Sequence, residues 1–230
     1  MNKPSACLLL IWLAAGFDSA LAAPVDCSVH MQEYHTKYGD DAHNGKSTYH
    51  ARLAYLESIN SPSCQSNVFY QTSKTGLLVL LGRVSEAMQC IDDADRRGLR
   101  PRQYVLESKA TTLLLIKKYD VIKVAQSLDD IGALFQEALR IENKEGSASR
   151  FPIYYAGLAE VALRKGNFDE AEKLIKIAIE LDSDSPSQYY SLAGVVASRQ
   201  KRWNQALQFL EMSIKKNKDN YLSEDETIRA

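Results

Sequence analysis

Apolar residues recur every three or four positions along most of the chain, in segments of about 12 to 18 residues separated by short polar breaks. This spacing is typical of amphipathic helices, because 3.6 residues complete one helical turn. Alternating Val, Ile and Thr runs bounded by Asn-Gly or Asp-Gly turns, which indicate strands, are almost absent. The pattern therefore predicts an all-α fold.

Two of the helical segments repeat each other. The stretch YYAGLAEVALRKGNFDEAEKLIKIAIELDSD begins at Tyr154 and aligns without a gap with YYSLAGVVASRQKRWNQALQFLEMSIKKNKD, which begins at Tyr189. The matching pairs include Tyr155 with Tyr190, Phe168 with Trp203, Ala171 with Ala206, and Ile175 with Leu210. A constant offset of this length indicates stacked units of supersecondary structure.

This pattern resembles the tetratricopeptide repeat, a helix–turn–helix unit of about 34 residues. The shared features are an aromatic residue early in the first helix, small residues at its centre, a turn glycine (Gly166), and an aromatic residue followed by an alanine in the second helix. The usual proline after the second helix is missing, and Ser183 and Lys218 stand there instead. For residues 151–218 the resemblance is clear, and it implies an α-solenoid of antiparallel helix pairs.

Residues 63–150 carry a degenerate form of the same pattern. The segment LLVLLGRVSEAMQCIDDA keeps a turn glycine at Gly82, and IGALFQEALRIEN matches the end of a second helix through Phe135 and Ala138. The stretch 119–127 is an insertion relative to the repeat, so the middle repeat is irregular. We expect degenerate helical pairs throughout this region.

The resemblance also implies a binding surface. In this family the first helices of stacked pairs line a concave groove that binds an extended peptide or a helix. The residues at the corresponding positions are Ile153, Ala156, Glu160, Leu163, Gln188, Ser191, Val195 and Ser198. This lining lacks the Lys and Asn set that clamps a terminal carboxylate, so it should not select an acidic tail. Tyr155 and Tyr190 are expected in the core, with Tyr154 and Tyr189 more exposed.

The last repeat suggests a second surface. In the preceding repeat, Leu174 and Ile177 lie where the next repeat would cover them, and their equivalents are Phe209 and Met212. Either the short polar tail 219–230 folds back over these two side chains, or they form a terminal docking patch for a partner or a second copy.

The N-terminal residues resemble a removable secretory signal. Lys3 precedes an apolar run from Ala6 to Phe17, and the small residues of Ala20-Leu21-Ala22 match the signal peptidase pattern. The run is too short for a permanent transmembrane helix, and no later segment is a better candidate. We therefore expect residues 1–22 to be removed, and the mature protein to be soluble and exported, most plausibly to a bacterial periplasm.

Three cysteines remain after the expected signal. Because an exported protein meets an oxidising compartment, a disulfide is expected, and the odd count leaves one thiol unpaired. Cys90 lies beside a helical apolar stripe and is expected to be a buried thiol. Cys27 and Cys64 lie at segment edges, so we favour a Cys27–Cys64 bridge that anchors an N-terminal helical cap over residues 23–62.

Charge and motifs narrow the possible functions. The net charge of −1 argues against nucleic acid as the main partner, because nucleic-acid binding requires a concentrated positive field. The basic stretch RRGLRPR (96–102) fits a helix end followed by a new helix, with an acidic partner or lipid phosphates as the alternative. No hydrolase, zinc-protease, phosphate-loop or dinucleotide-binding motif occurs. We expect no enzymatic activity and no cofactor.

All four histidines, His30, His35, His43 and His50, lie close together in the sequence. They raise the alternative of an envelope protein that binds a metal or a small ligand through this window. The spacing of His30 and His35 places them on different sides of a helix, and a turn separates His43 from His50. A metal site would need two helices to converge. The favoured hypothesis is therefore an exported scaffold that binds another envelope or secreted protein in envelope, secretion or pilus-type assembly.

Overall fold

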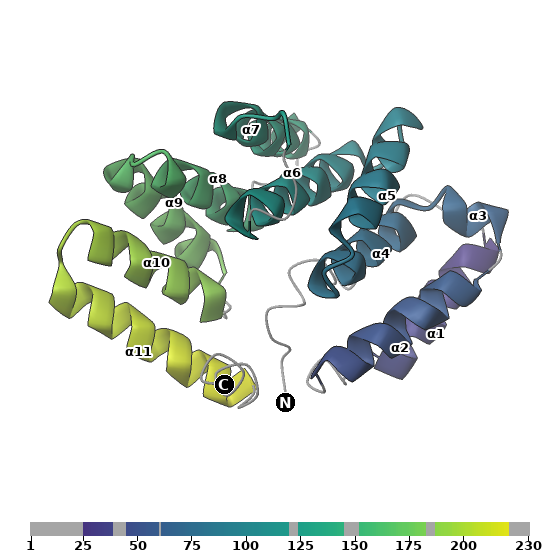
Figure 1. The fold of residues 1–230 in the computed structure, drawn as a ribbon, viewed down its shortest axis with the longest axis horizontal. Coiled ribbons are helices and arrows are strands. Elements are labelled where there is room, and N and C mark those ends of the chain that lie inside the picture. Colours follow the sequence, from purple (N-terminus) through teal and green to yellow (C-terminus); the bar gives the residue numbers. More distant parts are fainter. Residues whose placement is uncertain are drawn as a thin grey trace. The chain divides into compact units, whose positions relative to one another are not determined.

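The structure, a computed structural model, describes residues 25–38, 45–59, 61–119, 124–144, 152–182 and 187–220. Within these residues it contains eleven α-helices and no β-strand (Figure 1). The predicted all-α fold of packed helix pairs is confirmed. The expected signal segment, residues 1–22, lies outside the described residues. None of the described helices has the length and apolar character needed to cross a membrane.

The helices form two compact units. The N-terminal unit, Cys7–Val124, contains α1 to α6, and Ala125–Ala230 forms a C-terminal unit that contains α7 to α11. Their bounds are α1 Val25–Tyr38, α2 Gly45–Ser58, α3 Pro62–Gln65, α4 Val68–Leu80, α5 Val84–Arg96, α6 Arg102–Tyr119, α7 Leu128–Lys144, α8 Pro152–Arg164, α9 Phe168–Leu181, α10 Ser187–Arg199 and α11 Trp203–Asn220.

In the N-terminal unit, α2 packs against α1 and α4, and α4 packs against α5 and α6. The main core cluster is built from Met31, Tyr34, Leu53, Leu56, Tyr70, Leu77, Leu78 and Ala87. The start of α4 is fixed by Asn67, whose side chain accepts a hydrogen bond of 3.0 Å from the Tyr70 backbone N–H. The Tyr70 hydroxyl also donates to the Leu56 carbonyl at 2.9 Å. This buried polar contact holds α2 to α4.

In the C-terminal unit, each helix from α7 to α11 packs against the next one along the chain. Pairs α8/α9 and α10/α11 cover the two segments that share the 35-residue offset. The core combines small and aromatic side chains, namely Phe135, Ala138, Tyr154, Ala159, Ala162, Ala171, Ala178, Tyr189, Ala193 and Ala197. Small residues allow close approach, and at Gly157 a Cβ atom would lie 2.4 Å from the Phe135 ring. The sequence repeat is therefore a repeat in packing.

The helix pairs share one turn geometry. Gly82 and Gly166 adopt positive φ values of 74° and 81° between the two helices of their pairs. After Gly166, the Asn167 N–H donates to the Ala162 carbonyl at 2.9 Å and so closes the helix end. Lys201 occupies the same place between α10 and α11 with a φ of 61°. The last repeat thus keeps the turn although it has lost the glycine.

Candidate protein-interaction surfaces

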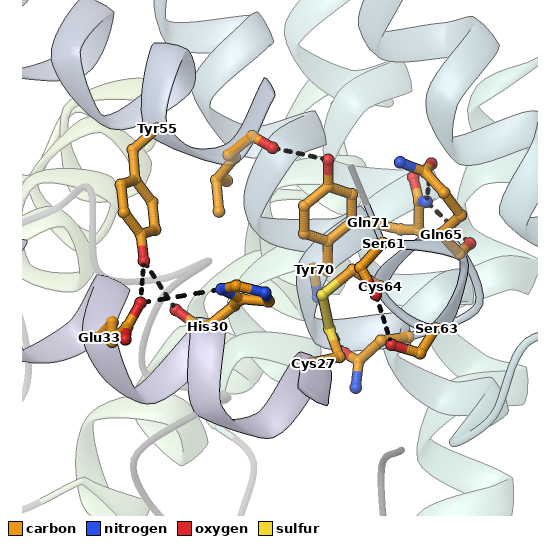
Figure 2. The surroundings of a disulfide bond; sticks show 12 residues. Cys27, His30, Glu33, Tyr55, Ser61, Ser63, Cys64, Gln65, Tyr70 and Gln71 are labelled. Atoms are coloured by element: carbon orange, nitrogen blue, oxygen red, sulfur yellow. Dashed lines mark hydrogen bonds and ion pairs between the residues drawn. A yellow bond between two sulfur atoms is a disulfide. The ribbon is translucent and has the colours of Figure 1, made fainter. Parts of the chain in front are cut away.

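A disulfide anchors the N-terminal end of the described chain. Cys27 on α1 and Cys64 on α3 are bonded, with their Cα atoms 4.9 Å apart, and both side chains are fully buried (Figure 2). This is the pairing that the sequence favoured, and it links two residues separated by 37 positions. Cys90 remains a free, partly buried thiol, and burial raises its pKa. The bridge ties α1 to the helix that leads into α4.

The described histidines do not converge. His30 Nδ1 lies 3.7 Å from Glu33 Oε2, and burial, followed by the charge of Arg52, lowers the pKa of His35. His50 is exposed on α2, and His43 lies outside the described residues. Among the described side chains, no group of three or more His, Cys, Asp or Glu residues could hold a metal ion. No observation on the described residues therefore favours the metal-binding alternative.

An aromatic cluster joins α1 to α2, which the sequence analysis did not foresee. The rings of Tyr34, Tyr38 and Tyr55 lie 5.5 to 6.1 Å apart. Lys37 Nζ lies 5.3 Å above the Tyr38 ring and 5.4 Å above the Tyr55 ring. The Tyr55 hydroxyl donates to Glu33 Oε2 at 2.9 Å (Figure 2). Burial, together with this hydrogen bond, raises the Tyr55 pKa to about 12.

A buried carboxyl group lies on α6. Glu107 has no exposed surface, and its Oε1 accepts a hydrogen bond of 2.9 Å from the Thr111 hydroxyl. Its Oε2 is also buried and has no hydrogen-bond partner. Burial raises the Glu107 pKa to about 8, so the group holds a proton at neutral pH. Because a substrate cannot reach it without opening the fold, this carboxyl is a structural group.

The basic stretch 96–102 is occupied by internal contacts. Arg97 Nη1 lies 3.2 Å from Asp93 Oδ2, and Arg102 forms an ion pair with Asp95. Gly98, with a φ of 66°, ends α5 as the sequence indicated. The hydrogen bond from Arg97 to the Ser66 hydroxyl at 2.8 Å further engages this stretch. These contacts favour the structural interpretation over a lipid or acidic-partner site.

The eight residues expected to line the groove lie on α8 and α10, which contact each other. Val195 is the most exposed of them, Ile153 is buried, and the remaining six are partly buried. Glu160 accepts two hydrogen bonds from Arg164, and Leu163 packs against the core at Ala162. The lining is thus neutral and only partly accessible, and its role in binding stays a prediction.

The expectation for the tyrosine pairs was partly wrong. Tyr154 and Tyr189 are buried, Tyr190 is also buried, and Tyr155 is partly buried. A first helix is covered on two sides, by the second helix of its own pair and by the second helix of the preceding pair. Side chains at the position of Tyr154 and Tyr189 are buried because the preceding helix, α7 or α9, packs there.

The last helix exposes more apolar surface than the sequence analysis anticipated. Met212 is 43% exposed and Phe209 is partly buried, so the two residues of the predicted docking patch differ in accessibility. Four further apolar side chains are exposed along another side of α11, namely Trp203, Leu207, Leu210 and Ile214. We call this set the terminal stripe. Leu210 matches Ile175 of α9, which is buried, whereas Leu210 is 39% exposed. It is exposed because no described helix follows α11.

A polar network joins α9 to the turn before α11. Glu172 pairs with Arg202, and Lys176 Nζ lies 2.6 Å from its Oε1. The Gln200 amide donates to Asp169 Oδ1 at 2.8 Å. The hydrogen bonds from Arg202 are the main cause that lowers the Glu172 pKa to about 2. This network lies at the edge of the surface where α10 covers α9.

Comparison with solved structures places this arrangement among known folds. MamA AMB-1 aligns with a TM-score of 0.51 and 15% identity over 82% of this chain and 98% of that one. MamA from Desulfovibrio magneticus RS-1 has a TM-score of 0.49 and 15% identity, covering 86% of this chain and 98% of its own. TPR-like repeats of a putative kinesin light chain from Podospora anserina have a TM-score of 0.49 and 14% identity, with coverage of 92% and 100%.

No family model matches the sequence, and no curated protein matches it. The fold similarity agrees with three features of the chain itself. These are a 35-residue sequence offset, paired helices over both copies, and the same turn geometry in each. The chain is a helical-repeat protein of packed helix pairs, and its fold is similar to that of MamA AMB-1.

Proposed function

We propose that this protein is an exported scaffold that binds other proteins through its helical repeats, in envelope, secretion or pilus-type assembly. The observation that carries the proposal is the contact of α8 with α10, which sets two first helices side by side with a row of mostly uncharged, partly exposed side chains. Such a row offers contact area without a reactive group. The proposed role is binding without catalysis, and the proposed partner is another envelope or secreted protein.

The chemistry of the row defines the kind of partner. Ala156, Ser191, Val195 and Ser198 carry no charge, and the carboxylate of Glu160 is already paired with Arg164. A neutral extended segment or an amphipathic helix suits this lining better than an acidic tail, since no free cation waits to meet a carboxylate among these side chains.

The binding test uses matched charge substitutions. Val195→Glu should reduce capture of native envelope proteins by the tagged chain, because a buried carboxylate at the interface remains unpaired. Lys173→Glu, on the exposed side of α9, should leave capture unchanged. Capture is measured by cross-linking in the native envelope followed by mass spectrometry. Equal loss or equal retention of the same proteins by both variants would contradict a role for this row.

Export is supported by the N-terminal apolar run and by the fully buried Cys27–Cys64 bridge, because disulfides persist in oxidising compartments. The test is fractionation of cells that express the chain with a C-terminal tag. We expect a periplasmic protein whose mass matches loss of residues 1–22. A full-length chain with both cysteines reduced in the cytoplasmic fraction would refute export.

A further inference from the structure

Helices α9 and α11 occupy equivalent positions in successive repeats, yet one side of them differs in accessibility. Ile175 on α9 is 1% exposed, whereas its match, Leu210, is 39% exposed. Trp203, Leu207 and Ile214 on α11 are 64%, 58% and 46% exposed, and their matches on α9 are all partly buried. The covering element on α9 is α10. On α11, Leu210 faces Gly194 of α10, and no further described helix of the C-terminal unit follows to cover this side.

Leu210 lies at the inner edge of the terminal stripe and faces α10, where a Cβ atom on Gly194 would lie 2.9 Å from its side chain. The other three stripe residues lie beside the side of α11 that packs on α10. Ala206 is buried there, and the Ser213 hydroxyl donates to the Ser187 carbonyl at 2.8 Å. The stripe residues follow one another at intervals of four, three and four, which places them along one line of the helix. This is the spacing of a helix that pairs with a second helix by knobs-into-holes packing.

One substitution distinguishes the two helices further. The position equivalent to Leu207 is Glu172, which pairs with Arg202 at the edge of the covering segment. On α11 the apolar Leu207 stands at the position of this carboxylate. Arg202, in the segment that covers α9, places a cation at this position. An element that covers α11 must instead be apolar there. A further repeat like α10, followed by the same Gln-Lys-Arg turn, does not meet that condition.

A second copy of the stripe meets it. In an antiparallel pair related by a two-fold axis, Trp203 meets Ile214 of the second copy, and Leu207 meets Leu210 of the second copy. Exposed Asn204 and Glu211 flank the stripe on the same side, so the same axis brings the amide of one copy near the carboxylate of the other. Exposed Lys215 lies farther round the helix. Two identical stripes thus match in size and bring no like charges together.

We propose that two copies of this protein pair through antiparallel contact of their terminal stripes on α11. The proposal deepens the proposed function and rests on it in one respect, since a paired scaffold presents two partner-binding rows. The pairing itself requires only α11. A large aromatic anchor, Trp203, at each end of the contact supplies the kind of side chain that dominates interface energetics.

The test is the mass of the full chain in solution, measured by light scattering after size exclusion. We expect the wild-type chain to be a dimer and Leu207→Glu, which introduces the residue type that α9 carries, to halve the mass without loss of helicity. Gln208→Glu, exposed on another side of α11, is the matched control and should remain dimeric. A monomeric wild-type chain, or a dimer that survives Leu207→Glu, overturns the proposal.

The orientation has its own test in a Cys90→Ala background. Chains carrying Trp203→Cys mixed with chains carrying Ile214→Cys should form a mixed disulfide, while Trp203→Cys alone should not cross-link. Cross-linking of Trp203→Cys with itself overturns the antiparallel arrangement. A monomer that still captures envelope proteins refutes the pairing and leaves the scaffold function standing, whereas a dimer that captures none refutes the scaffold function instead.

Discussion

The two units of this chain bury different kinds of side chain. Among the described residues, all but two of the buried polar or charged side chains lie in the N-terminal unit, and the exceptions are Glu142 and Ser187. On α4 and α6 they form the set Gln71, Thr72, Ser73, Thr75, Gln103, Glu107, Ser108 and Thr112. The C-terminal unit instead packs small against aromatic side chains. The N-terminal unit adds buried polar groups and a disulfide to its apolar core, and the C-terminal unit depends on close apolar packing.

This difference explains why only one unit shows a regular repeat in its sequence. Close packing of helices requires small residues at fixed positions, and these produce the alignment of Ala171 with Ala206. Buried polar groups are hydrogen-bonded to particular partners, as Tyr70 is to the Leu56 carbonyl, and such pairs need not recur at a fixed offset. The units should therefore respond differently to reduction, pH and changes of side-chain volume.

The largest expected effect is removal of the disulfide. The double substitution Cys27→Ala and Cys64→Ala opens a loop closed across 37 positions, which should destabilise the N-terminal unit by roughly 4 kcal/mol on the chain-entropy model. With Trp12→Phe, the fluorescence of Trp203 reports the C-terminal unit alone, and circular dichroism reports both units. Urea unfolding should show an earlier helix loss with an unchanged Trp203 transition.

Cys90→Ala is the control for this comparison, because it removes a thiol that closes no loop. It should shift neither transition by as much as the double substitution does. If the Trp203 transition moves together with the helix signal, the two units unfold as one. The difference between their cores then gives no difference in their stability.

The next effect concerns the buried carboxyl of the N-terminal unit. Burial raises the Glu107 pKa from an ordinary 4.5 to about 8, so the unfolded chain loses this proton at lower pH than the folded chain does. The stabilising contribution is complete below pH 4.5 and is lost as the pH rises through about 8. Glu107→Gln should remove this loss, which is about 1.4 kcal/mol per pH unit and so about 2 kcal/mol between pH 6.5 and 8.

The measurement is urea unfolding followed by circular dichroism, from pH 6.5 to above 8, because protonation of His35 contributes below the ordinary histidine pKa of 6.5. Glu180→Gln, an exposed change on α9, should retain the wild-type pH slope. A Glu107→Gln variant with the wild-type slope would show that the carboxyl is ionised in the folded chain.

The fold was largely predictable from the sequence where packing is periodic. The spacing of apolar residues predicted helices throughout, and the offset predicted the pairs α8/α9 and α10/α11. The polar core of the N-terminal unit was not predicted. Side chains such as Gln71 and Ser108 look exposed in a helical pattern, and the packing of α4 and α6 against several neighbouring helices makes them buried.

The candidate surfaces were predictable only in part. The helices that carry them were identified correctly, and the Cys27–Cys64 pairing was favoured from segment edges. The exposed terminal stripe of α11 was not predicted, because alignment with α9 pairs Leu210 with the buried Ile175. Burial of a repeat position depends on the following repeat, so a residue of the last repeat cannot inherit the environment of its match. The change from Glu172 to Leu207 was the available signal.

A smaller effect is expected at two glycines of the C-terminal unit, one next to a buried side chain and the other next to an exposed one. Gly157→Ala places a Cβ atom 2.4 Å from the ring of Phe135, which is buried and cannot move, so a loss of about 2 kcal/mol is expected. Gly194→Ala places one 2.9 Å from Leu210, which can rotate toward solvent. Its cost should be offset by the better helix propensity of alanine, up to about 1 kcal/mol. Thermal unfolding gives both values, and equal losses would mean that Leu210 is as confined as Phe135.

The smallest expected effect concerns Glu172, whose contribution to stability changes with pH in the opposite direction to that of Glu107. Glu172 in the C-terminal unit has a pKa lowered to about 2, chiefly by hydrogen bonds from Arg202. A depressed pKa stabilises the folded state above pH 4.5, and this contribution is lost as the pH falls through about 2. Because both side chains are partly exposed, Arg202→Gln should cost no more than about 1 kcal/mol at neutral pH, and less at high salt.

Urea unfolding followed by Trp203 fluorescence at two salt concentrations measures this loss of stability. Arg140→Gln, which removes an exposed ion pair on α7, is the control. If Arg202→Gln shifts the Trp203 transition equally at low and high salt, the Arg202 side chain acts through packing. The contrast in pH response between the two units then rests on Glu107 alone.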